Sequence, residues 1–85
     1  MTPYRVFLAR EVVESLRRLP IRQRAELTRF MASLEGSPFQ RGDYTERDDV
    51  DRPIEVRIIG RYALCYWADH AVREVKVLDL KPAGS

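Results

Sequence analysis

Two stretches in the first half of the chain carry apolar residues at every third or fourth position, which is the spacing of a helix that buries one face. In residues 9–19 the apolar stripe comprises Val12, Val13, Leu16 and Leu19. In residues 21–34 it comprises Leu27, Phe30, Met31 and Leu34. Pro20 cannot continue the first helix but suits the first turn of the second, so we expect an antiparallel helical hairpin.

Alternating apolar and polar positions predict four strands, at residues 4–8, 54–59, 62–67 and 72–80. The order of elements is then β-α-α-β-β-β. This order is typical of an α+β domain, and we expect an antiparallel-rich four-stranded sheet with the helical hairpin packed on one face. Residues 36–52 are rich in Gly, Pro, Asp and Arg, and we expect a loop there with a short extended piece around Tyr44.

The alternation also separates the two faces of the expected sheet. We expect the helices to cover the apolar set, which comprises Ile54, Val56, Ile58, Val75 and Val77. The other face would then show Glu55, Arg57, Glu74, Lys76 and Leu78.

The strand at 62–67 has two possible orientations, because a shift of one residue reverses every side chain. A two-residue turn at Gly60-Arg61 would place Ala63, Cys65 and Trp67 with the core. A three-residue turn would instead place Tyr62, Leu64 and Tyr66 there. The sequence leaves both registers open.

The size of the chain limits the classes of protein that it can form. With 85 residues, we expect residues 1–85 to be a single domain, which excludes a multidomain enzyme and a dinucleotide-binding fold. One cysteine, Cys65, cannot form an intramolecular disulfide and disfavours a thiolate zinc site. No apolar run approaches the about 20 residues of a transmembrane helix, and no signal pattern is recognisable. We therefore expect a cytoplasmic protein that uses no cofactor and no metal.

Basic residues are concentrated in the first half of the chain. Residues 1–42 hold eight basic and four acidic side chains, whereas residues 43–51 hold one basic and five acidic ones. Of the 15 basic residues 13 are arginine, whose planar fork binds phosphate at two points. We expect nucleic-acid contacts at Arg17, Arg18, Arg22 and Arg24, with an ordinary solvated helix surface as the alternative.

Between Ile54 and Asp69 the chain resembles the RelE/ParE superfamily of bacterial toxins. In that family the middle strands carry a basic residue, then a turn with glycine, then two tyrosines. Gly60, Tyr62 and Tyr66 match this pattern, and Arg57 stands where a basic residue is common. The likeness extends to the length of the chain and the order of its elements.

The resemblance implies a toxin of a type II toxin–antitoxin pair that is silenced by a cognate antitoxin protein. RelE-like members cut mRNA in the ribosomal decoding site, whereas ParE-like members inhibit DNA gyrase. A RelE-like endoribonuclease acting on ribosome-bound mRNA is the reading that we favour. The family's strand arginine falls on Ala63 here, and no tyrosine follows Lys81. A gyrase inhibitor, or a degenerate member that only binds a partner protein, therefore stays open, as does a sheet-mediated homodimer.

Cutting RNA through its own 2′-hydroxyl needs a base, an acid and cations that stabilise the crowded phosphorus centre. The candidate catalytic residues are Arg57, Arg61, Lys76 and Lys81. We expect these cations to project from the face of the sheet that the helices leave open; the alternative is that they form ion pairs within the sheet. His70, the one histidine, is expected in a solvated turn, and Cys65 is expected to be a packing residue.

Overall fold

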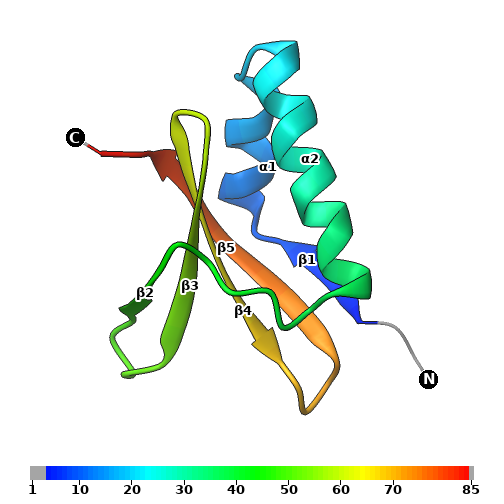
Figure 1. Ribbon diagram of the computed structural model, residues 1–85, viewed down its shortest axis with the longest axis vertical. Helices are drawn as coiled ribbons and strands as arrows, with labels where there is room; N and C mark the ends of the chain where they lie inside the picture. The colour runs from blue at the N-terminus through cyan, green and yellow to red at the C-terminus, as the bar shows by residue number, and fades with distance from the viewer. Residues whose placement is uncertain (1–3, 85) are drawn as a thin grey trace.

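The computed structural model describes residues 4–84, which form one layer of helices against one curved sheet (Figure 1). The helices are α1 (Arg10–Arg17) and α2 (Ile21–Gly36). The strands are β1 (Arg5–Leu8), β2 (Tyr44–Arg47), β3 (Pro53–Ile59), β4 (Tyr62–Asp69) and β5 (Glu74–Pro82). The expected α+β class is confirmed, and both helices and the four expected strands are present within a few residues of their expected ends.

The sheet differs from the expected one in strand number and direction. Within residues 4–84 it has five strands in the order β1-β5-β4-β3-β2. β1 pairs with β5 in parallel, while the other neighbours are antiparallel, so the sheet is mixed. The additional strand, β2, is the short extended piece at Tyr44, which pairs with the first half of β3.

The turn between β3 and β4 has two residues, because Ile59 pairs directly with Tyr62. Gly60 occupies this turn with a φ of 61°, which glycine adopts without steric cost. This register places Ala63 opposite Ile58 and Cys65 opposite Val56. The two-residue turn of the first alternative is therefore correct. Its placement of Ala63, Cys65 and Trp67 with the core under the helices is wrong, because Leu64 and Tyr66 lie there instead.

The helices nevertheless pack on the other face of β3 and β4. The main core lies between the helices and the sheet. The helices contribute Val12, Leu16, Leu27, Met31 and Leu34, and the strands contribute Leu64, Tyr66, Val75, Val77 and Leu80. Ile54, Val56, Ala63 and Cys65 form a second buried cluster, away from the helices. The expectation for Val75 and Val77 is confirmed. The expectation for Ile54 and Val56 is wrong, and Ile58 is 37% exposed.

An irregularity in β5 explains how its apolar positions reach the helix face. Cys65 pairs with Asp79 and Tyr66 pairs with Val77, so Leu78 has no partner in this register. A bulge of this kind adds one residue to a strand and reverses the alternation beyond it. Val77 and Leu80 therefore both face the helices, although they lie three positions apart along the strand.

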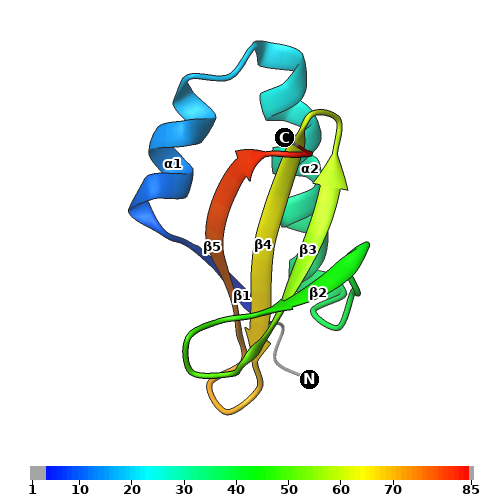
Figure 2. The same ribbon diagram turned by 90° about the vertical axis from the view of Figure 1, so that its left-hand side faces the viewer.

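The face opposite the helices is partly covered by the chain itself. Figure 2 shows β2 and the loop to β3 crossing in front of the sheet. Two contacts hold them there: Glu46 of β2 reaches Lys81 of β5 at 3.7 Å, and Arg52 lies over the Trp67 ring of β4. The expectation of an uncovered face is therefore wrong. No helix in the described residues is long and apolar enough to span a membrane.

Candidate functional site

Arg57 lies on the helix side of the sheet. It pairs across the β3–β4 ladder with Leu64, which belongs to the core under the helices. Its guanidinium lies 5.3 Å from the centre of the Phe30 ring of α2, a distance at which the cation is attracted to the ring face. The expectation that Arg57 projects from the open face is wrong, because the helices cover the side of β3 that carries it.

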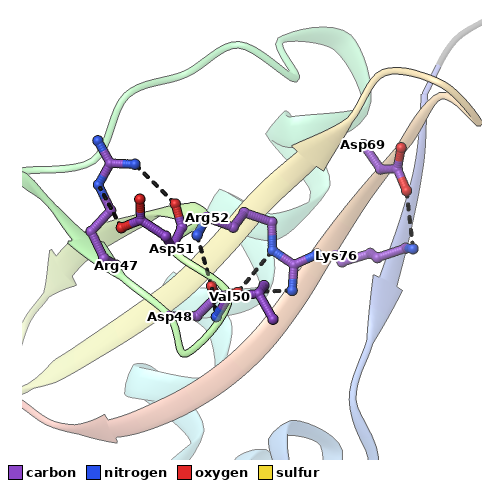
Figure 3. Close-up of polar contacts among 7 residues, drawn as sticks. All are labelled: Arg47, Asp48, Val50, Asp51, Arg52, Asp69 and Lys76. Atoms are coloured by element: carbon purple, nitrogen blue, oxygen red, sulfur yellow. Dashed lines mark hydrogen bonds and ion pairs between the residues drawn. The ribbon is translucent and has the colours of Figure 1, made fainter.

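Lys76 does project from the face opposite the helices, but it is engaged there. Its Nζ lies 3.2 Å from Asp69 Oδ2 and 5.3 Å from the centre of the Trp67 ring (Figure 3). The partner is Asp69 of the adjacent strand, and Glu74 instead pairs with Arg5 at 3.7 Å. Lys76 thus forms an ion pair within the sheet, the alternative that the sequence left open for this residue.

Lys81 lies on the same face as Lys76, near the other end of β5. It pairs with Ala63, and its Nζ lies 3.7 Å from Glu46 Oε1. The pKa of Lys81 is raised by the ionised form of Cys65 and by Glu46. Burial raises the pKa of the Cys65 thiol itself, so at neutral pH the carboxylate of Glu46 is the relevant charge. A raised pKa keeps Lys81 protonated, which suits a cation that faces a phosphate.

Arg61 lies beside Lys81 at this end of the sheet. It occupies the turn before Tyr62, and its backbone carbonyl accepts a hydrogen bond of 2.8 Å from the N–H of Ala83. Its side chain is exposed. We call Arg61, Lys81 and Glu46 the Lys81 site. Sequence reasoning missed Glu46 because it assigned residues 43–51 to an acidic loop, whereas β2 carries this carboxylate across the sheet.

The four expected catalytic residues therefore do not form one site. Arg61 and Lys81 are neighbours, while Arg57 lies on the opposite face. Lys76 precedes Lys81 by five positions on β5, which is about 16 Å at ~3.3 Å per residue.

The arginines expected to contact nucleic acid lie around the turn between the helices. Arg17, Arg18, Arg22 and Arg24 are all exposed, and none forms an ion pair with another residue in the range 4–84. The Arg24 guanidinium donates a hydrogen bond of 3.4 Å to the Leu19 carbonyl. In Figures 1 and 2 this turn lies at the same end of the molecule as the β3–β4 turn that carries Arg61. The structure thus gathers these cations and the Lys81 site at one end.

The loop between β2 and β3 is organised by Asp48 (Figure 3). Its Oδ1 accepts hydrogen bonds from the N–H groups of Val50 and Arg52, at 3.0 and 2.8 Å. Its Oδ2 lies 2.8 Å from both Nε and Nη2 of Arg52. The hydrogen bond from the Arg52 N–H is the main cause that lowers the pKa of Asp48, and the Arg52 side chain adds to it.

Asp48 thereby positions Arg52 against Trp67. The guanidinium carbon lies 4.1 Å from the centre of the indole ring, and Lys76 approaches the same ring. The indole Nε1 is buried and finds no hydrogen-bond acceptor in the described part of the chain. Sequence reasoning placed Trp67 with the core in one register but gave Arg52 no role, because the contact depends on the loop crossing the sheet.

A cavity of about 430 Å³ lies between the loop after α2, the start of β3 and the end of β4. Its lining includes Phe39, Arg41, Arg52, Trp67 and His70. The rings of Phe39 and His70 are stacked with their centres 4.8 Å apart. His70 is exposed and lies in the turn after β4, as expected. Its Nδ1 lies 2.7 Å from the Tyr4 hydroxyl, so the ring also belongs to an aromatic cluster. We call this space the aromatic cavity.

The sequence matches no family model and no curated protein, but solved structures do match. A chain of the archaeal RelE–RelB complex from Pyrococcus horikoshii OT3 has a TM-score of 0.81 and 29% identity, covering 99% of this chain and 98% of that chain. A chain of the toxin–antitoxin complex RelBE2 from Mycobacterium tuberculosis has a TM-score of 0.76 and 25% identity, covering 94% and 98%.

A third structure, the RelBE toxin–antitoxin complex of E. coli, shares the fold, with a TM-score of 0.64 and 16% identity over 96% of this chain and 99% of that one. The alignments extend over nearly the full length of both partners, so the likeness includes all the elements described above. These comparisons confirm the resemblance to the RelE/ParE superfamily that the strand pattern indicates, and the chain is similar in fold and sequence to chains of RelE–RelB complexes.

Proposed function

We propose that this protein is the toxin of a bacterial-type toxin–antitoxin pair and acts in the cytoplasm as an endoribonuclease on ribosome-bound mRNA. The observation that carries the proposal is the likeness to the RelE–RelB complex of Pyrococcus horikoshii OT3, at 29% identity over 99% of the chain. Since the three structures described above are toxin–antitoxin complexes of the RelE–RelB type, we also propose a cognate antitoxin as partner.

The Lys81 site supplies groups for metal-independent cleavage. Attack by the ribose 2′-hydroxyl needs a base at that hydroxyl, cations at the crowded phosphate and an acid at the leaving oxygen. Arg61 suits the phosphate, because its guanidinium stays charged and binds oxygens at two points. Lys81 stays protonated at neutral pH and is the group that we assign to the leaving oxygen, to which its ammonium would donate a proton as the bond breaks. Glu46, 3.7 Å from Lys81, is the carboxylate in place to accept the proton of the hydroxyl.

The other expected catalytic residues have supporting roles in this proposal. Arg57, half-buried beside Phe30, adds positive charge near the same end of the sheet. Lys76 is held by Asp69 and Trp67 and contributes charge to the face rather than chemistry. The exposed cations at Arg17, Arg18, Arg22 and Arg24 would bind backbone phosphates of ribosomal RNA and orient the Lys81 site on the message.

The proposal is tested by inducing the protein in a bacterial host without an antitoxin. We expect growth arrest, with amino-acid incorporation falling before DNA synthesis. The double variant Arg61→Ala with Lys81→Ala should permit growth. Arg73→Ala, which removes an exposed charge at the β4–β5 turn, is the control and should arrest growth like the wild type. Unimpaired growth at a confirmed protein level would indicate a protein that only binds a partner. An early fall in DNA synthesis would identify gyrase as the target. Either result contradicts the proposal.

A further inference from the structure

The aromatic cavity lies apart from the Lys81 site and has a role of its own. Its volume of about 430 Å³ falls within the range of small-molecule pockets, about 300–1,000 Å³. One wall is the stacked pair of Phe39 and His70. The lining also includes Trp67, with the Arg52 guanidinium over its ring. Flat π surfaces therefore make up part of the lining.

Phe39 is unusual in this wall because it is 68% exposed. It contributes little to the hydrophobic core, yet its position is defined by several contacts. Its ring stacks on His70 at 4.8 Å and meets the edge of Tyr4 at 6.0 Å. Next to it, the Gln40 carbonyl accepts a hydrogen bond of 3.1 Å from the Tyr66 hydroxyl. The fold thus holds an aromatic ring at the surface in one orientation.

Cations surround the aromatic surfaces. Arg41 has a side chain that is 82% exposed and lies 3.6 Å from Glu55. Glu55 also accepts a hydrogen bond of 2.7 Å from the Gly42 N–H, so its carboxylate is shared between Arg41 and Gly42. A single ion pair at such exposure is weak and is readily exchanged for a phosphate. Arg52, by contrast, is fixed by Asp48 and serves as a flat surface.

Fixed aromatic rings next to exposed arginines are the combination that binds single-stranded nucleic acid, since bases stack on the rings and phosphates meet the cations. We propose that the aromatic cavity binds an unpaired base of single-stranded RNA, with the adjoining phosphate at Arg41. This inference rests on the proposed function, because it makes the message itself the ligand, and it extends the contact to the end of the molecule opposite Arg61.

Trp67 provides a direct measurement, because it is the one tryptophan of the chain. Its fluorescence is followed while a short single-stranded oligoribonucleotide is titrated into the purified protein at low salt. We expect saturable quenching as a base enters beside the indole. Unchanged fluorescence together with no binding of the same labelled oligonucleotide by anisotropy would overturn the proposal.

Phe39→Ala and Phe7→Ala form a matched pair, because both remove an exposed phenyl ring, 68% and 44% exposed, and Phe7 does not line the cavity. Loss of one stacking surface corresponds to about a tenfold weaker Kd. We expect this loss for Phe39→Ala, its recovery in Phe39→Tyr, and an unchanged Kd for Phe7→Ala. Equal effects of the two alanine variants would contradict a base site at Phe39.

Arg41→Ala tests the phosphate contact separately. The slope of log Kd against log salt concentration should fall by the amount that corresponds to about one phosphate contact. The quenching of the Trp67 fluorescence at saturation should stay the same. An unchanged slope would contradict the phosphate contact. The growth assay distinguishes this inference from the proposed function. A wild-type protein that arrests growth but does not bind the oligonucleotide refutes the cavity alone, and a wild-type protein that binds it without arresting growth refutes the function alone.

Discussion

Tyr66 joins the core to the loop that follows α2. Its ring is 1% exposed and packs against Phe30, and its hydroxyl donates a hydrogen bond of 3.1 Å to the Gln40 carbonyl. Burial raises the pKa of this phenol to about 12, and the charge of Glu55 acts in the same direction. One side chain thereby determines where the loop that carries Phe39 meets the sheet.

Tyr66→Phe removes this hydrogen bond and little else. We expect a loss of about 0.5–1.5 kcal/mol in the free energy of unfolding, measured by urea denaturation. Because the folded pKa exceeds the ordinary value of 10.0, the wild type should also lose stability as pH rises from 10 toward 12, and the variant should lose less. Tyr44→Phe, at a residue that is 48% exposed, is the control. An equal cost in the two variants would contradict the account.

At the scale of elements, the two helices can be predicted from the sequence, because the spacing of their apolar residues fits a helix and no other element. The arrangement of the sheet cannot be predicted in the same way, because both of its faces carry buried apolar residues. The alternation along β3 separates Val56 from Arg57 correctly, but the helices pack on the side that carries Arg57. β2, with the polar residues Thr45, Glu46 and Arg47, gives no apolar pattern, and yet it helps to cover the second cluster. The sequence therefore predicts where each candidate cation lies along its strand, but it does not predict on which face of the sheet the cation lies.

The loop between α2 and β2 depends on Gly42, which lies against the backbone of β3. A Cβ at this position would overlap the Val56 carbonyl group, and the next residue, Asp43, donates its N–H to the same carbonyl oxygen at 2.7 Å. Gly42→Ala should therefore displace the loop and cost about 1–3 kcal/mol. Gly36→Ala, where a Cβ meets open space, is the control in the same denaturation experiment. A cost for Gly42→Ala no larger than that for Gly36→Ala would show that the loop does not need this close approach.

Asp48 controls the loop between β2 and β3 through its charge. Its pKa is lowered from 3.8 in the folded protein, chiefly by the Arg52 N–H, so its contribution to stability is present above that value and is lost as pH falls below it. Asp48→Asn should reduce stability at neutral pH, and the difference from the wild type should shrink in acid. Thermal unfolding at a series of pH values measures this. Asp49→Asn, at an exposed neighbour, should show no such dependence, and a constant difference for Asp48→Asn would contradict the assignment.

At the scale of the whole molecule, the two ends of the sheet carry different chemistry. The end with the helix turn and the β3–β4 turn gathers exposed arginines and the Lys81 site. The other end carries the aromatic cavity with Phe39 and His70. A single-stranded message that runs along the sheet can meet stacking surfaces at one end and cations with acid–base groups at the other. Under the two proposals, base binding and cleavage would therefore take place at opposite ends of the same sheet.

The most direct test of this account maps the 5′ ends of an mRNA after incubation with purified protein, with the message either free or bound to ribosomes. We expect new ends in the ribosome-bound message alone. The rate at which these ends appear should fall by about 10²–10⁴-fold for Glu46→Gln or Lys81→Ala, which is the loss typical of a general base or acid. It should be unchanged for Arg73→Ala. Equal cutting of free and bound message, or full cutting by Lys81→Ala, would contradict the central claim.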